Sequence, residues 1–276
     1  MSNKIVISPE EKSAQSLNEI NLEKALLALR DDGFIVVSDA VCHGHLDKIQ
    51  QQMDKDAQKL IDAEQWSGAG GLPGHLMLGP PPFNPYVFSD IVANPFAIQI
   101  NHKLLGDGFF SGLYSGNTNC PGSEKQPLHR DVNHLWPNLK NAHPAASLVV
   151  NIALDDVNEE RGSIELWPGT HMDAFDGSVI DEKTEENRRV VSAPIRGNTS
   201  KGSILIRDMR LWHRGTPNTS KRLRHMIAMV HNIGWLVRGR KLTFGTGCES
   251  QFPETPLDYN STFSNDSIDY VGLRNC

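Results

Sequence analysis

The sequence predicts an all-β core with flanking α-helices, in which a mainly helical N-terminal third precedes a β-sandwich or barrel. Apolar residues recur at helical spacing in the first third, whereas after about Phe109 short alternating runs are separated by turn residues. With 276 residues and 38% hydrophobic content, the chain can bury a sizeable core. We expect one domain, with helices and a loop over 1–107, the β core over 108–245 and a tail over 246–276.

The N-terminal elements follow from local patterns. A helix is predicted between Asn21, a possible N-cap, and Gly33, because leucines recur there at helical spacing. Residues 34–41 have the composition of a strand, and 45–65 repeat apolar residues as a second amphipathic helix does. The segment 68–85 is so rich in Gly and Pro that we expect an irregular loop, of a type that often covers sites.

The β core is predicted from alternation and turns. Apolar residues alternate through 147–154, as in a strand that faces a core; the residues expected to point inward are Leu148, Val150, Ile152 and Leu154. "EERG", "PGT" and "NTSK" are turn signals between such runs. Beyond about Gly245 the tail is polar and weakly patterned, and we expect it to be loosely packed.

Composition excludes several classes of function. The net charge is −6 and no long Lys/Arg run occurs, so neither a nucleic acid nor an anionic membrane is expected as partner, and a small molecule is favoured. No apolar signal or spanning segment is visible, which predicts a cytoplasmic protein. The sequence does not distinguish a monomer from a homodimer. The cysteines form no CxxC pair, which argues against a zinc ribbon and a disulfide framework; they are Cys42, Cys120, Cys248 and Cys276.

The stretch "PLHRDVNHLWP" places His129 and Asp131 two positions apart. In a strand both side chains project to one face, where an imidazole nitrogen and a carboxylate oxygen can share a metal ion. His213, which ends a patterned strand in "LWHRGTPNTS", is the best candidate for a third ligand. A second pair with the same spacing, His171 and Asp173, follows a Pro-Gly turn, so the spacing alone is weak evidence.

Three segments carry a family resemblance. In their order, "QPLHRD", "LVVNIALDDVNEERGSIELWPGTH" and "KGSILIRDMRLWHRGTPNTSKRLR" resemble the phytanoyl-CoA dioxygenase family of Fe(II)- and 2-oxoglutarate-dependent oxygenases. The resemblance implies a double-stranded β-helix, a cupin-like jelly roll whose N-terminal helices buttress one sheet. It also implies that His129, Asp131 and His213 bind iron. "PGTH" corresponds to a structural turn in this family, which gives His171 and Asp173 a structural role.

The cosubstrate implied by the resemblance requires an anchor. The C5 carboxylate of 2-oxoglutarate calls for a bidentate cation, and Arg222 and Arg224 share a strand face, so the pattern alone does not separate them. The family's usual eleven-residue step from the distal histidine, His213, selects Arg224. We expect Thr216 to assist Arg224. Gln126 matches a position that contacts the cosubstrate in similar enzymes.

Candidate substrate contacts are less distinctive. Asn117 and Asn119 share one face of a strand that leads toward the metal motif, and they could contact substrate or cap a turn. Trp136 could stack on a ligand or serve packing. His75 and Met77 could belong to a lid, although simple loop packing is favoured.

The activity predicted from these residues is that of a dioxygenase that uses Fe(II), 2-oxoglutarate and O2. It would oxidise, by default hydroxylate, an unactivated C–H bond of a small organic substrate, with a secondary metabolite as the favoured class. Three alternatives stay open: a halogenase, against which Asp131 argues; a zinc hydrolase, which has no need of Arg224; and a non-catalytic cupin-like metal-binding protein. The C-terminal "RNC" is not a peroxisomal signal, which argues against fatty-acid oxidation.

Overall fold

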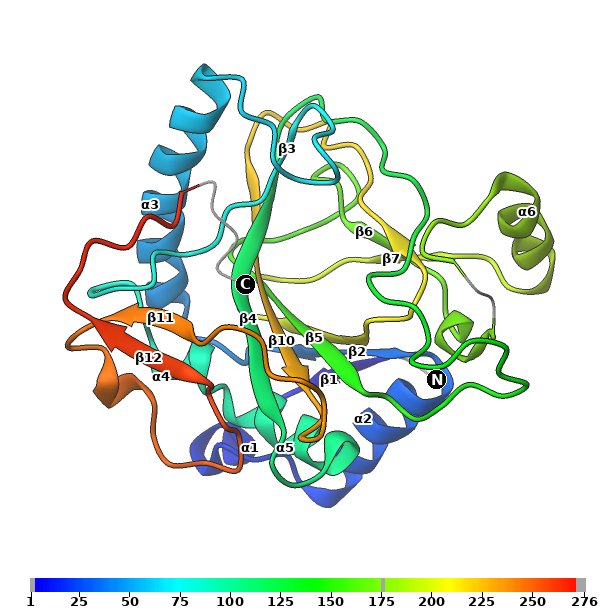
Figure 1. Ribbon diagram of the computed structural model, residues 1–276, viewed down its shortest axis with the longest axis horizontal. Coiled ribbons are helices and arrows are strands. Elements are labelled where there is room, and N and C mark those ends of the chain that lie inside the picture. The colour runs from blue at the N-terminus through cyan, green and yellow to red at the C-terminus, as the bar shows by residue number, and fades with distance from the viewer. Residues whose placement is uncertain (1–2, 175–176, 272–276) are drawn as a thin grey trace.

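The computed structural model describes residues 3–174 and 177–271 of the chain (Figure 1). The helices are α1 (Pro9–Ala14), α2 (Glu19–Asp31), α3 (His43–Asp62), α4 (Ser89–Val92), α5 (Pro95–Leu105) and α6 (Glu182–Val191). The strands are β1 (Lys4–Val6), β2 (Phe34–Ser38), β3 (His75–Leu76), β4 (Phe110–Asn119), β5 (Ser147–Ala153), β6 (Ile164–Leu166), β7 (Ile195–Gly197), β8 (Ile204–Asp208), β9 (His213–Arg214), β10 (Arg224–Asn232), β11 (Leu242–Gly245) and β12 (Ser261–Ser264).

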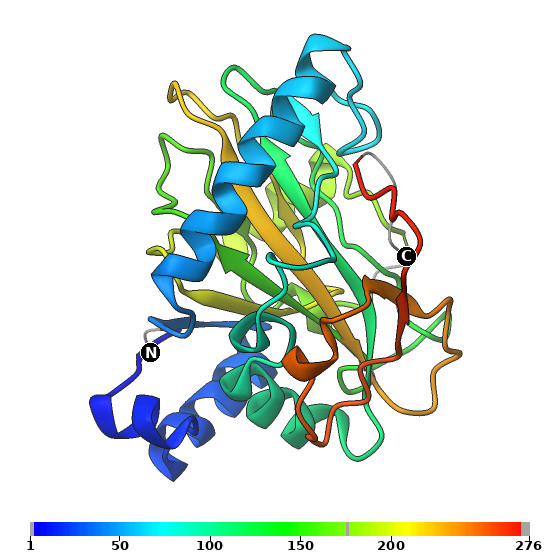
Figure 2. The ribbon, with the colours of Figure 1, turned by 90° about the vertical axis from the view of Figure 1, so that its left-hand side faces the viewer.

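The core contains two β-sheets, with α2, α3 and α5 against the main one and α6 beside the smaller one (Figure 1). The main sheet has seven strands in the order β1-β2-β8-β5-β10-β4-β3, and a smaller sheet has the order β7-β6-β9. Figure 2 shows α3 lying across one face of the main sheet, and in Figure 1 β6 and β7 lie beyond the opposite face. The two sheets share no strand pairing among the described residues, so they face each other without closing into a barrel.

The two faces of the main sheet have different chemistry because side chains alternate along each strand. All four residues expected to point inward from 147–154 belong to the main hydrophobic cluster, together with Leu46 and Ile49 of α3. That prediction is confirmed. Val149 lies opposite Arg207 in the antiparallel β5–β8 pair, and therefore both project toward the smaller sheet. The helix-covered face is mostly apolar but also holds a few buried polar residues, such as His231 beside Asn101 of α5 and His225 beside Asp54 of α3.

The structure corrects the predicted start of the first long helix. Its N-cap is Asn18, whose side chain accepts a hydrogen bond from the backbone N–H of Asn21, so Asn21 lies inside the helix. The helix ends just before Gly33, as predicted, and Gly33 has a φ of 82°. A side chain at Gly33 would collide with the ring of His171, since a Cβ there would lie 2.6 Å from its Nδ1 atom.

The tail is better packed than its polar composition predicted. Strands β11 and β12 pair in parallel, and Phe252 packs edge-on against Phe244 with ring centroids 4.8 Å apart. The expectation of loose packing is therefore wrong for residues 246–271, because a few aromatic residues suffice to attach the tail. Residues 272–276, which include "RNC" and Cys276, lie outside the described residues.

No helix in the described part of the chain is both long and apolar enough to cross a membrane. Cys42, Cys120 and Cys248 are free thiols, the last two buried. A cytoplasmic location stays a prediction.

His231 on β10 predicts a specific pH dependence of stability. Its ring is buried beside the Asn101 amide, and burial lowers its pKa to about 4. The unfolded chain would take up a proton near the ordinary histidine pKa of about 6.5, so stability is complete above that pH and falls as the pH drops toward about 4. We expect the free energy of unfolding to lose up to roughly 3 kcal/mol over this window through His231.

Urea unfolding of the wild type and of His231→Gln from about pH 7 to about pH 4 measures this contribution. Glutamine can still accept from Asn101 but does not titrate, so the difference between the two proteins should shrink on acidification. An unchanged difference would show that His231 does not titrate in this window.

Candidate metal centre

His129, Asp131 and His213 come together where the smaller sheet faces the main sheet. Asp131 Oδ1 lies 3.9 Å from Nε2 of His129 and 3.5 Å from Nε2 of His213. One potential ligand atom from each residue lies within 4.8 Å of the others, and this is the only such group among the described residues. The side chains of His129 and Asp131 are 29% and 27% exposed, whereas that of His213 is buried. The group is open to solvent on one side.

The backbone fixes the two imidazoles. The N–H of His129 donates to the carbonyl oxygen of His213 at 3.0 Å and the N–H of His213 donates back at 2.8 Å, so the two residues are directly opposed and project to one face. Nδ1–H of His129 donates to the carbonyl of Pro127, and Nδ1–H of His213 to that of Leu211, each at 2.9 Å. Both Nε2 atoms are thereby left with a lone pair for a metal.

The charge state of the group suits a cation. Burial would raise the pKa of the Asp131 carboxyl, but the Arg207 guanidinium and the two imidazoles outweigh it and hold that pKa well below its usual value. Burial and the charge of Arg207 lower the pKa of His213 to about 3. At neutral pH Asp131 is therefore a carboxylate and His213 a neutral imidazole, which are the forms that bind metals.

The three residues fit a divalent metal such as Fe(II). Metal–nitrogen and metal–oxygen bonds of about 2.1 Å bring adjacent ligand atoms to about 3 Å, so the observed separations close with small side-chain movements. Two histidines and one carboxylate on one face leave the opposite positions of the ion open. The donor set therefore suits an ion that must also bind exogenous ligands.

Arg224 and Arg222 differ sharply in environment. Arg224 is buried; its Nη1 donates to Oδ1 of Asn117 at 2.7 Å and its Nη2 to the carbonyl of Gly162 at 3.3 Å. Burial, and then the charge of Arg161, lowers the Arg224 pKa to about 10, so it remains a cation at neutral pH. The side chain of Arg222 is 64% exposed and pairs with Asp155. Only Arg224 has the buried position that the predicted anchor requires.

Gln126 and Thr216 use their polar atoms within the protein. Gln126 Oε1 accepts from the N–H of Gly215 at 2.9 Å, and its Nε2 lies 3.3 Å from Nδ1 of His75. The Thr216 hydroxyl donates to the carbonyl of Ser163 and accepts from Arg196. Their predicted contacts with a cosubstrate stay predictions.

The three predicted substrate contacts do not lie together. Asn117 is exposed and holds Arg224, whereas Asn119 is buried and donates to the carbonyl of Thr216. Trp136 is 51% exposed and lies 6.4 Å, centroid to centroid, from the ring of Trp235. Asn119 thus has a structural task in this conformation, and the roles of Asn117 and Trp136 stay predictions.

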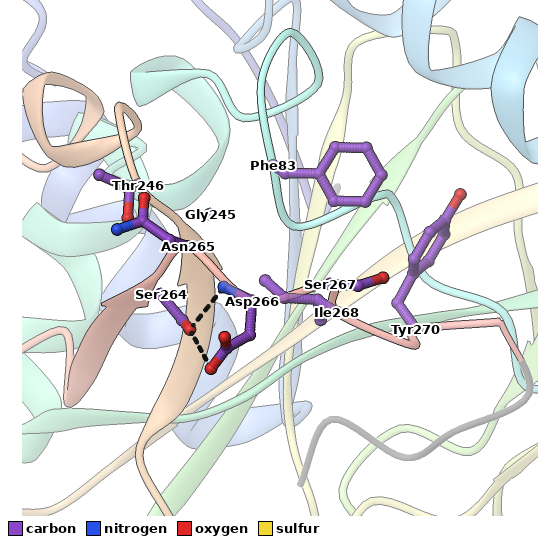
Figure 3. Close-up of a pocket in the computed structure, with 9 residues that line it drawn as sticks. All are labelled: Phe83, Gly245, Thr246, Ser264, Asn265, Asp266, Ser267, Ile268 and Tyr270. Carbon is purple, nitrogen blue, oxygen red and sulfur yellow. Dashed lines mark hydrogen bonds between the residues drawn. The ribbon is translucent and has the colours of Figure 1, made fainter.

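His171, Asp173 and the pocket of Figure 3 lie apart from the metal ligands. His171 is buried and its Nε2–H donates to the carbonyl of Arg30, which is the structural role expected for it. A pocket of about 520 Å³ is lined by Phe83, by Tyr270 and by residues 264–268 of the tail, and Figure 3 shows the rings of Phe83 and Tyr270 close to each other at one side of it. None of the predicted site residues lines it.

One buried residue near the site, Arg207, was not singled out from the sequence, and a second, His75, was expected only to pack in its loop or to belong to a lid. Arg207, on β8, donates from Nη2 to Oδ2 of Asp131 at 2.6 Å. His75, in the Gly/Pro-rich segment, pairs with the end of β4 and donates from Nε2 to the carbonyl of Glu124 at 2.7 Å. Arg207 could have been noticed in the sequence, because it is a charged residue that directly follows the apolar residues of "SILIRD". Nothing in the composition of 68–85 indicates that His75 is buried.

Two curated fungal proteins are similar to the chain. It is 24% identical over 214 residues to "Dioxygenase af480" from Aspergillus fumigatus, an alignment that covers 73% of this chain and 63% of that protein. It is 28% identical over 142 residues to "Dioxygenase FrzG" from Cladobotryum, covering 48% of this chain and 46% of that protein. The chain therefore matches between about half and two thirds of the length of these relatives.

Solved structures confirm the predicted fold class. HygX from Streptomyces hygroscopicus, crystallised with nickel, 2-oxoglutarate and hygromycin B, matches with a TM-score of 0.58 at 14% identity, covering 82% of this chain and 91% of that chain. AviO1 from Streptomyces viridochromogenes matches with a TM-score of 0.54 at 16% identity, covering 78% and 96%. The model of the phytanoyl-CoA dioxygenase (PhyH) family matches residues 29–226, well over half of the sequence. The chain therefore belongs to the phytanoyl-CoA dioxygenase family, as its motifs predicted.

Proposed function

We propose that the protein is an Fe(II)- and 2-oxoglutarate-dependent dioxygenase that oxidises, most simply hydroxylates, a C–H bond of a small organic substrate. The observation that carries the proposal is the His129, Asp131 and His213 group with both Nε2 atoms free, facing a sheet surface on which Arg224 is buried. The family match, the dioxygenase names of the two curated relatives and the 2-oxoglutarate in the HygX crystal support it.

The residues divide the work between metal and cosubstrate. His129, Asp131 and His213 would hold Fe(II), which supplies the oxidative decarboxylation of 2-oxoglutarate by O2 to succinate and CO2 and the oxidation of the substrate. Arg224 would bind the C5 carboxylate through charge-assisted hydrogen bonds, because its buried guanidinium offers two donors in a plane. The strand register supports this role. Val230 pairs with Val149, which pairs with Arg207, and Arg224 is six positions from Val230 on β10, so Arg224 and Arg207 project to the same face of the main sheet.

The substrate class rests on narrower support. HygX was crystallised with hygromycin B, a small molecule, and the negative net charge of this chain disfavours polyanionic partners. A secondary metabolite is the class we propose, with the enzyme in the cytoplasm. The substrate must reach the solvent-open side of the metal centre, where His129 and Asp131 are partly exposed.

Cosubstrate turnover tests the proposed activity. Purified protein with Fe(II), 2-oxoglutarate and O2 should form succinate together with O2 uptake, slowly without substrate and faster with it. Asp131→Ala should reduce succinate formation to background, because a ligand of the metal is lost. Absence of both succinate formation and 2-oxoglutarate binding in the wild type, with metal bound, would favour a metal-binding protein of another kind.

A further inference from the structure

Arg207 touches the metal centre through a single ligand. It lies on β8, its side chain is 7% exposed, and its Nη2 donates to Asp131 Oδ2 at 2.6 Å. A second bond holds Asp131 to the same part of the main sheet, because the N–H of Asp131 donates to the carbonyl of Met209, directly after β8. Arg207 is the basic residue paired with Asp131 at this position.

Arg210, three positions along the chain, is a buried arginine whose guanidinium is well supplied with hydrogen-bond partners. Arg210 uses Nε and Nη2 on the two oxygens of Asp208, at 2.9 and 2.7 Å, and Nη1 on the carbonyl of His143 at 2.7 Å. In Arg207, by contrast, Nε and Nη1 are buried and have no hydrogen-bond partner among the described residues. Burying a charged group that makes a single hydrogen bond is costly. We therefore infer that the main role of the Arg207 side chain is its contact with Asp131.

The contact with Arg207 gives the two carboxylate oxygens of Asp131 different partners. Oδ2 accepts the charge-assisted hydrogen bond, while Oδ1 is the oxygen that faces Nε2 of His129 and Nε2 of His213. A carboxylate can bind a cation through one oxygen or through both. With Oδ2 occupied by Arg207, only Oδ1 is available to the ion.

We propose that Arg207 is a positioning residue that keeps Asp131 a one-oxygen ligand and so leaves free a coordination position that 2-oxoglutarate needs. The inference rests on the proposed function, because it concerns room for the cosubstrate on the same ion. Without Arg207, Asp131 can turn both oxygens to the metal and compete with the cosubstrate. Metal binding itself does not need Arg207, since a guanidinium beside a cation contributes repulsion.

Three variants separate the hydrogen bond from the charge and from general destabilisation. Arg207→Leu removes both donor and charge, whereas Arg207→Gln keeps an N–H that can donate to Asp131 Oδ2 but has no charge. Arg210→Leu is the matched control: it removes a buried guanidinium from a buried carboxylate three positions away, without touching a metal ligand. Thermal unfolding of each variant reports whether it is folded before binding is measured.

The readouts need no turnover. Anaerobic titration with Co(II) or Fe(II) gives the metal affinity, 2-oxoglutarate titration of the metal-loaded protein gives the cosubstrate affinity, and the Co(II) absorption spectrum before cosubstrate is added reports coordination number. For Arg207→Leu we expect metal affinity within about threefold of wild type, because the loss of repulsion between the guanidinium and the cation offsets the loss of the hydrogen bond that orients Asp131. We also expect a changed Co(II) spectrum and 2-oxoglutarate affinity at least about tenfold weaker. Arg207→Gln should recover most of the cosubstrate affinity, and Arg210→Leu should bind both as the wild type does.

Each contrary result overturns the proposal in its own way. Unchanged 2-oxoglutarate affinity or an unchanged Co(II) spectrum in Arg207→Leu would show that Asp131 needs no restraint. Loss of metal in that variant would make Arg207 part of metal retention instead. If Arg207→Gln behaves as Arg207→Leu does, the residue acts by charge alone. Failure of the metal-loaded wild type to bind 2-oxoglutarate, in contrast, would contradict the proposed function itself.

Discussion

Alanine at any one of His129, Asp131 and His213 is expected to weaken Fe(II) binding by more than about 100-fold. Partners outside the ligand shell commonly cost 10- to 100-fold in metal affinity, and removal of a direct ligand from a three-ligand face costs more. A remaining histidine cannot move to replace the lost ligand, because each imidazole is fixed by a hydrogen bond from its Nδ1 to the backbone. Anaerobic Fe(II) titration of the three variants measures the effect.

His171→Ala is the control for this series. His171 has the same HxD spacing in the sequence, but it is buried and bonded to the carbonyl of Arg30. This variant should unfold at a lower temperature, because a buried ring and its hydrogen bond are lost, and yet bind Fe(II) as the wild type does. Iron binding that depends on His171 and survives His129→Ala would place the metal at the other motif.

Arg224→Ala is expected to raise the dissociation constant for 2-oxoglutarate from roughly 30-fold to several thousand-fold. Removing one partner of a buried charge pair costs about 2–5 kcal/mol, much of it from leaving the other charge unpaired. The cavity left by Arg224 offers the C5 carboxylate no replacement of that kind, since Arg161 is committed to Asp155 and to the carbonyl of Leu223. Titration of the metal-loaded protein with 2-oxoglutarate under anaerobic conditions gives the constant.

Arg222→Ala is the control for the positive charge that is lost in Arg224→Ala. Arg222 is two positions away, largely exposed, and paired with Asp155 at the surface, so its removal should change the 2-oxoglutarate affinity by less than about threefold. Equal losses in Arg222→Ala and Arg224→Ala would mean that burial does not select the anchor, and the assignment of Arg224 would then be wrong.

The fold was predictable where periodicity and motif order agree. Alternation predicted the inward residues of β5, and the ordered motifs predicted the family and its fold class, both of which are confirmed. The short helices α5 and α6 were not predicted. Leu257 and Phe244 are buried in or beside the tail although the tail is polar overall, so averaged composition hid its packing.

The site was predictable only in part, because sequence spacing identifies metal ligands better than the residues that position those ligands. The close spacing of His129 and Asp131 can be recognised from sequence alone, and the structure brings His213 beside them. The expected strand is wrong, however, because His129 forms only isolated β-bridges, one of them with His213, and Asp131 lies in a bend. Arg207 and His75 reach the site through sheet register and burial, which depend on strands far apart in the sequence. Asn119 shows the converse: its position on the strand face was predicted, but its amide is occupied by Thr216.

The metal and cosubstrate sites can be seen directly in a crystal structure of the protein grown without O2 in the presence of Fe(II) and 2-oxoglutarate. We expect one ion bonded to Nε2 of His129, Nε2 of His213 and Oδ1 of Asp131, with 2-oxoglutarate on the same ion. Its C5 carboxylate should accept hydrogen bonds from the Arg224 guanidinium. An ion held elsewhere, or a 2-oxoglutarate whose C5 carboxylate lies away from Arg224, would contradict these assignments.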